Sequence, residues 1–130
     1  DPGVARQRHR LAEQTCSDRL RPQDRQGSRR AYLAVASGPV AVAGFRLGES
    51  LSWGRFLYVD DLVTTSASRS RGYGGALLSW LTEFAAAEGC HQLHLDSGIQ
   101  RKDAHRFYAR EGMQAVGYHF VKTIDQGIAG

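Results

Sequence analysis

A glycine-rich segment, Arg69-Ser-Arg-Gly-Tyr-Gly-Gly-Ala76, carries the clearest chemical signal in this sequence. An apolar, β-branched stretch precedes it, and the pattern of an amphipathic helix follows it. Glycines at 72, 74 and 75 permit a tight turn whose backbone N–H groups can approach a ligand closely. The helix that follows would direct the positive end of its dipole to the same place. The segment therefore predicts a binding site for an anion, and a pyrophosphate group suits it best.

Two common nucleotide-binding motifs do not fit this segment. The dinucleotide fingerprint Gly-x-Gly-x-x-Gly would need a small residue at position 77, where the sequence has Leu77. The phosphate-binding loop of nucleoside triphosphatases would need Gly-Lys-Ser/Thr after the glycines, and none follows. The sequence therefore argues against both classes.

The pattern Arg/Gln-x-x-Gly-x-Gly/Ala, met by Arg69, Gly72 and Gly74, resembles the coenzyme A signature of the GNAT family of N-acetyltransferases. Two further segments resemble the family in the same order: Leu57-Tyr-Val-Asp-Asp-Leu-Val63, like its central strand, and Ala104-His-Arg-Phe-Tyr-Ala-Arg-Glu-Gly-Met113. The resemblance implies a mixed α/β sheet with an antiparallel first half, helices on both faces and a splayed central strand. It also implies acetyl transfer from acetyl-CoA to a primary amine in a ternary complex.

The resemblance implies a cofactor site in which the pantetheine arm pairs with the backbone of the splayed strand. That backbone would belong to Leu62, Val63 and Thr64. The preceding pair, Asp60 and Asp61, breaks the strict alternation of the strand, as a local bulge would. Arg101 stands where the family often has Asn, so its guanidinium could instead reach a phosphate or an acidic substrate group. The other residues implied to bind the cofactor are Arg69, Ser70, Arg71, Gly72, Tyr73, Gly74, Gly75, Ala76, Ala104 and Phe107.

Tyr108 falls on the family's Phe-Tyr position, where the resemblance implies a general acid for the departing sulfur. A phenol is protonated at neutral pH and can donate to a developing thiolate. The helical spacing of its neighbours also suits an amphipathic core tyrosine.

Asp60 occupies the position where several members of the family carry a Glu that receives the proton of the amine. Asp61 can reach the same pocket only if a bulge turns one of the two side chains. His94, His105 and His119 are the alternative bases. Paired acids favour a cationic acceptor such as a polyamine, lysine or an aminoglycoside.

The net charge of +4 belongs to the first thirty residues, which hold eight Arg against four acidic residues. Residues 31–130 carry nine basic and nine acidic side chains, so the charge argues against a nucleic-acid partner. The expected acceptor is therefore a small-molecule or protein amine. Two alternatives remain open: a non-catalytic, acetyl-CoA-binding regulatory domain, and a toxin-like enzyme that acetylates an RNA-borne amine.

The length predicts one domain over residues 1–130, with a basic N-terminal segment (1–30) and a recognisable core (31–124). The sequence has no apolar run of ~18 residues, which argues against a membrane span. Cys16 and Cys90 are isolated and form no metal-binding spacing, so we expect a cytoplasmic protein without a metal. The family resemblance makes a homodimer plausible.

Periodicity and turn residues predict the elements that position these groups. The family's usual first strand has no convincing counterpart. The expected helices cover residues 2–15, the stretch from the glycines to 88, and 101–111, with a short helix or irregular connection at 17–30. The expected strands cover residues 31–36, 40–47, 55–65, 91–96 and 113–124.

Overall fold

The computed structural model describes residues 16–19, 27–65, 72–125 and 127. The helix predicted over residues 2–15 lies outside them. The chain forms two compact units, Asp1–Leu95 and Asp96–Gly130. The single-domain organisation stays a prediction. Within the described part of the chain, no helix is both long and apolar enough to cross a membrane.

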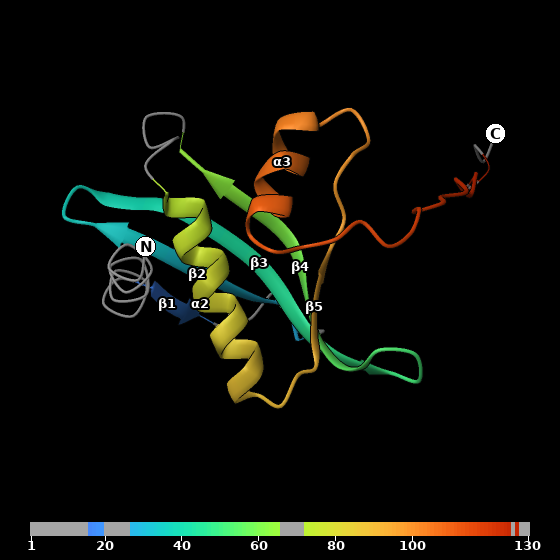
Figure 1. Ribbon diagram of the computed structural model, residues 1–130, viewed down its shortest axis with the longest axis horizontal. Helices are drawn as coiled ribbons and strands as arrows, with labels where there is room; N and C mark the ends of the chain where they lie inside the picture. Colours follow the sequence, from blue (N-terminus) through green and yellow to red (C-terminus); the bar gives the residue numbers. More distant parts are fainter. Residues whose placement is uncertain (1–15, 20–26, 66–71, 126, 128–130) are drawn as a thin grey trace. The chain divides into compact units, whose positions relative to one another are not determined.

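The first unit contains a five-stranded mixed sheet with the strand order β1-β2-β3-β4-β5 (Figure 1). The first three pairings are antiparallel, and β4 pairs with β5 in parallel. The mixed sheet with an antiparallel first half is thus confirmed. The strands are β1 (Cys16–Arg19), β2 (Arg29–Val35), β3 (Gly38–Ser50), β4 (Gly54–Thr64) and β5 (Gln92–Leu95).

Two predictions for the first unit need correction. Strand β1 lies where the sequence predicted helix or an irregular connection. Its sequence, Cys-Ser-Asp-Arg, has no apolar alternation, and it becomes a strand by pairing with β2. Strand β3 continues through residues 48–50, beyond the strand predicted over 40–47, because these residues pair with the start of β4.

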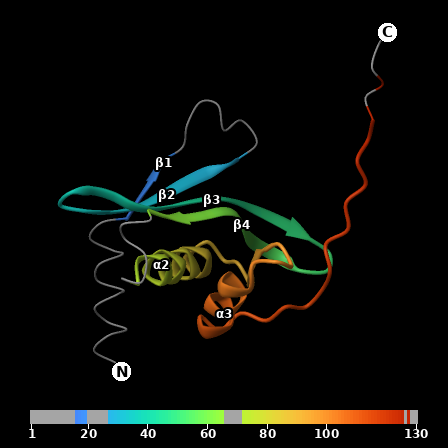
Figure 2. The ribbon, with the colours of Figure 1, turned by 90° about the horizontal axis from the view of Figure 1, so that it is seen from above.

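Helix α2 (Tyr73–Ala87) packs on one face of the sheet (Figure 2). The predicted apolar face of the helix is confirmed, since Leu77 and Leu81 are fully buried. They meet Phe45 of β3 and Leu57 of β4, which point to the same side of the sheet. Gly89, at φ +79°, follows the helix in a conformation that side chains disfavour.

The second unit contains α3 (Lys102–Arg110), which confirms the helix predicted over 101–111. The strand predicted over residues 113–124 is wrong, because the chain there forms neither strand nor helix. Tyr118 and Phe120 are 86% and 90% exposed. Alternating apolar residues show which side chains would share a face, but a strand also needs a neighbour to complete its hydrogen bonds. No described strand pairs with this segment.

Candidate active site

A bulge interrupts strand β4 at Asp60. Val59 is opposite Phe45 of β3, and Asp61 is opposite Gly44, which directly precedes Phe45. Asp60 has no opposite residue of its own on β3 and is the extra residue. Val59 is buried, and Leu62 packs against the core. With one extra residue between these two inward-facing side chains, both carboxylates project from the other face of the sheet. The predicted bulge is confirmed, and it brings the two acids to the same side.

Strand β4 extends beyond its parallel neighbour. Strand β5 pairs with residues 56–59 of β4, whereas the pairing of β4 with β3 continues to Thr64. Within the described residues, no strand covers the β5 side of residues 60–64. The backbone groups on a strand edge of this kind can pair with another extended chain. The edge contains the three residues that the family resemblance implied for the pantetheine arm, namely Leu62, Val63 and Thr64.

Helix α2 starts directly after a glycine in the left-handed conformation. Gly72 precedes the helix at φ +80°, and its carbonyl accepts a hydrogen bond of 2.9 Å from the N–H of Ala76. The first N–H groups of a helix have no partner within it, and the first turn of α2 carries no acidic side chain. Of the predicted loop residues, Arg69, Ser70 and Arg71 lie outside the described part of the chain.

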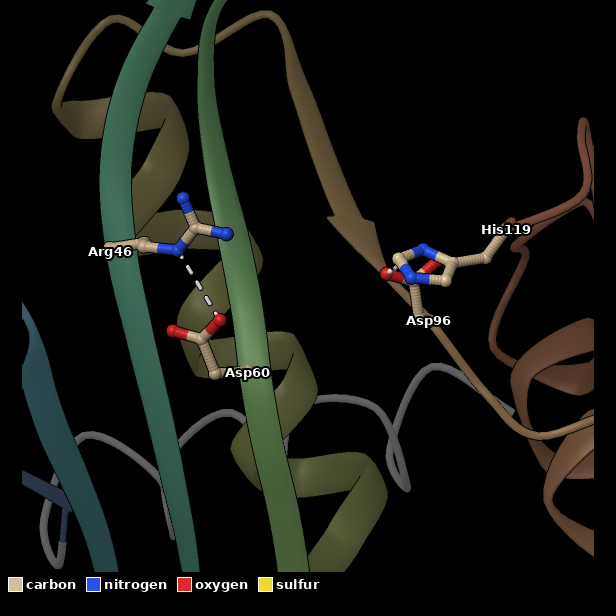
Figure 3. A network of polar contacts seen from close by, with 4 residues as sticks. All are labelled: Arg46, Asp60, Asp96 and His119. Carbon is tan, nitrogen blue, oxygen red and sulfur yellow. Dashed lines mark hydrogen bonds and ion pairs between the residues drawn. The ribbon is translucent and has the colours of Figure 1, made fainter. Parts of the chain in front are cut away.

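Asp60 and Asp61 differ in their surroundings. The Nε of Arg46 donates a hydrogen bond of 3.3 Å to Oδ1 of Asp60 (Figure 3). The carboxylate of Asp61 has no ion-pair or hydrogen-bond partner among the residues that the structure describes. A Cβ on Gly44 would lie 3.4 Å from Oδ2 of Asp61, so the absence of a side chain at position 44 leaves space beside this carboxylate.

Arg46 is a residue that the sequence reasoning missed. Its guanidinium lies 4.6 Å from the centre of the Tyr58 ring, the residue opposite it on β4. An Arg on a strand has no distinguishing pattern, and only the register of β3 against β4 places it beside the bulge.

The second unit holds the third motif. Ala104, Phe107 and Tyr108 are all half-buried on α3, and Arg101 is exposed just before the helix. The rings of Phe107 and Tyr108 lie 5.3 Å apart. The carbonyl of Tyr108 accepts a hydrogen bond of 2.9 Å from the N–H of Met113, so the Gly112 turn closes back onto the helix.

The three histidines considered as bases have different partners. His94 stacks on Trp53 with 3.6 Å between ring centres, and burial lowers the pKa of His94. His105 lies 2.8 Å from the carbonyl of Gly98 through Nε2. His119 pairs through Nδ1 with Oδ2 of Asp96 at 3.5 Å, both half-exposed or more (Figure 3). Trp53 was not singled out from the sequence, because its contact with His94 joins a turn to a distant strand.

The model of the acetyltransferase (GNAT) family matches residues 4–113 of the chain. The chain belongs to this family. The uncharacterized N-acetyltransferase YhdJ of Bacillus subtilis is 43% identical to it over 58% of this chain and 54% of that protein. The aminoalkylphosphonate N-acetyltransferase of Salmonella typhimurium is 36% identical over 51% of this chain and 43% of that protein. The chain thus matches about half the length of these GNAT relatives.

Solved structures share the GNAT fold with this chain. An aminoglycoside N-acetyltransferase, AAC(6')-Iy, solved in complex with CoA, superposes with a TM-score of 0.70. The match covers 77% of this chain and 78% of that one, at 9% sequence identity. At this identity, the likeness extends to the fold.

Proposed function

We propose that the chain is an acetyl-CoA-dependent N-acetyltransferase that transfers the acetyl group to a primary amine by direct attack in a ternary complex. The observation that carries the proposal is the end of β4. There, a bulge with two carboxylates adjoins a strand edge that none of the described strands covers, and in the sequence this edge precedes the glycines that lead into α2. Membership of the GNAT family supports the same reaction class.

The donor would be held mainly by backbone groups. The edge of Leu62, Val63 and Thr64 suits the amide groups of a pantetheine arm, which can pair with it as another strand would. The N–H groups at the start of α2, after Gly72, suit the pyrophosphate. Arg69 and Arg71 would add charge-assisted contacts to its oxygens. Bound in this way, the donor supplies the thioester that is attacked.

A carboxylate of β4 would receive the proton of the amine. Between the two, Asp61 is better suited than Asp60, because Asp60 already accepts a hydrogen bond from Arg46. Asp61 would take a proton from the bound ammonium and pass it to solvent, which leaves the nitrogen lone pair free to bond to the acetyl carbon. As the carbon–sulfur bond then breaks, the nitrogen would lose its second proton to Asp61. Tyr108 would give its phenolic proton to sulfur, as its motif implies, and regain one from solvent. The products are the amide and the free thiol.

The acceptor would be a small-molecule or protein amine, and we place the reaction in the cytoplasm. A thiol-release assay with acetyl-CoA across classes of amine tests the proposal. We expect thiol release that depends on the amine, together with a product heavier by one acetyl group. Binding of acetyl-CoA without turnover of any amine would instead favour a regulatory domain.

A further inference from the structure

The face of the sheet that carries the two carboxylates also carries a guanidinium. Residues two positions apart on a strand share a face, so Arg46 lies on the side of Gly44, which is opposite Asp61. The ion pair with Asp60 turns the guanidinium toward the bulge (Figure 3). A positive group and the carboxylate of Asp61 therefore lie near each other on this face.

The contacts of Arg46 hold its guanidinium while leaving donors available. The Tyr58 ring lies under it, and Nε is bonded to Asp60. Across residues 27–65 and 72–125, no ion pair or hydrogen bond occupies its two Nη groups. The Arg46 side chain is 47% exposed, so a solute can reach them. A guanidinium fixed in this way can offer paired N–H groups to a carboxylate or a phosphonate.

From this arrangement we infer that Arg46 determines acceptor specificity by binding an anionic group of the acceptor. The inference rests on the proposed acetyl transfer. The acceptor would place its ammonium at Asp61 and its anionic oxygens at the Nη groups of Arg46. Gly44 and Arg46 are about 7 Å apart along β3, from a rise of ~3.4 Å per residue. Because a hydrogen bond of about 3 Å at each end takes up part of this backbone spacing, a compact amine with a carboxylate or phosphonate a few bonds away fits it.

The test compares each acidic amine with the plain amine that lacks its acidic group. Glycine is the amine with a carboxylate, and aminomethylphosphonate is the amine with a phosphonate. Each is compared separately with methylamine, which has no acidic group. The measured quantity is the ratio of kcat/KM between acidic and plain amine, in the wild type and in Arg46→Gln. Comparing ratios between the two proteins cancels the different intrinsic reactivities of the amines.

We expect Arg46→Gln to lower this ratio by about 10- to 100-fold, which is the usual effect of removing a charged hydrogen-bond partner. The loss should fall mainly on KM, and Arg46→Lys should retain part of the ratio. The acidic amine whose ratio falls further in Arg46→Gln identifies carboxylate or phosphonate as the natural anionic group of the acceptor. Arg110→Gln, which removes an exposed Arg of α3, is the matched control and should leave the ratio unchanged.

Equal losses for acidic and plain amines would overturn the inference, since Arg46 would then act only by holding Asp60. Acetylation of amines with a ratio that Arg46→Gln does not alter would also overturn it, while acetyl transfer would stand. Turnover of no amine at all would refute acetyl transfer and the inference with it. If Arg46→Gln does not fold, methylphosphonate and acetate can be tested as inhibitors of wild-type methylamine acetylation. Competition with the amine is expected, and no inhibition by either anion would contradict the inference.

Discussion

The different surroundings of Asp60 and Asp61 on β4 lead to a direct prediction. Asp61→Asn should reduce kcat/KM strongly near neutral pH and less in alkaline buffer. The substitution removes a proton acceptor, a role that typically contributes 10²- to 10⁴-fold. Raising the pH supplies more of the neutral amine and should partly replace the lost carboxylate.

Asp60→Asn should have a smaller effect that varies little with pH. In the structure Asp60 is engaged with Arg46, and an exposed pair of this kind stabilises a protein by about 0–1 kcal/mol. Its loss should therefore leave the unfolding midpoint nearly unchanged. We expect a change in kcat/KM of about 10-fold or less, from the altered position of the guanidinium.

The assay is thiol release at saturating acetyl-CoA, from pH 6.5 to 9.5, for the wild type and both variants. Thermal unfolding of each protein shows whether the fold is intact, and calorimetry shows whether acetyl-CoA still binds. If the alkaline rescue occurred in Asp60→Asn and not in Asp61→Asn, the roles would be reversed. A pH-independent loss in both variants would mean that the acids bind the acceptor without accepting its proton.

Three further predictions test other parts of the structure. Gly74→Val should fold but bind acetyl-CoA at least ~100-fold more weakly, a loss of about 3 kcal/mol in binding free energy, because a side chain there obstructs the approach of the pyrophosphate. Unchanged affinity in calorimetry would show that the start of α2 is not part of the site. Tyr108→Phe should keep acetyl-CoA affinity and lower kcat by ~10²-fold or more, and a near wild-type rate would assign the acid to another group. Because burial lowers the pKa of His94, the unfolded chain takes up its proton first, so stability should fall as the pH drops below about 6.5. His94→Gln should flatten that dependence in thermal unfolding scans, whereas His91→Gln, at an exposed position, should retain it.

Local features of the sequence determined the central elements of the fold. The four-residue spacing of Leu77, Leu81 and Ala85 defines the buried face of α2, because side chains at that spacing share one side of a helix. The break in alternation at Asp60 and Asp61 predicted the bulge for a similarly local reason. A strand that must bury both Val59 and Leu62 with two polar residues between them needs an extra residue.

Pairing between distant segments was decided only by the tertiary structure. Strand β1 has no pattern of its own and exists through its bonds to β2, whereas residues 113–124 have the alternation of a strand but pair with no described strand. The register of β3 on β4 places Arg46 beside Asp60 and Gly44 beside Asp61, and thereby separates two carboxylates that are equivalent in the sequence. Sequence periodicity specifies which side of an element a residue occupies, but a cross-strand neighbour depends on register, which the whole sheet determines.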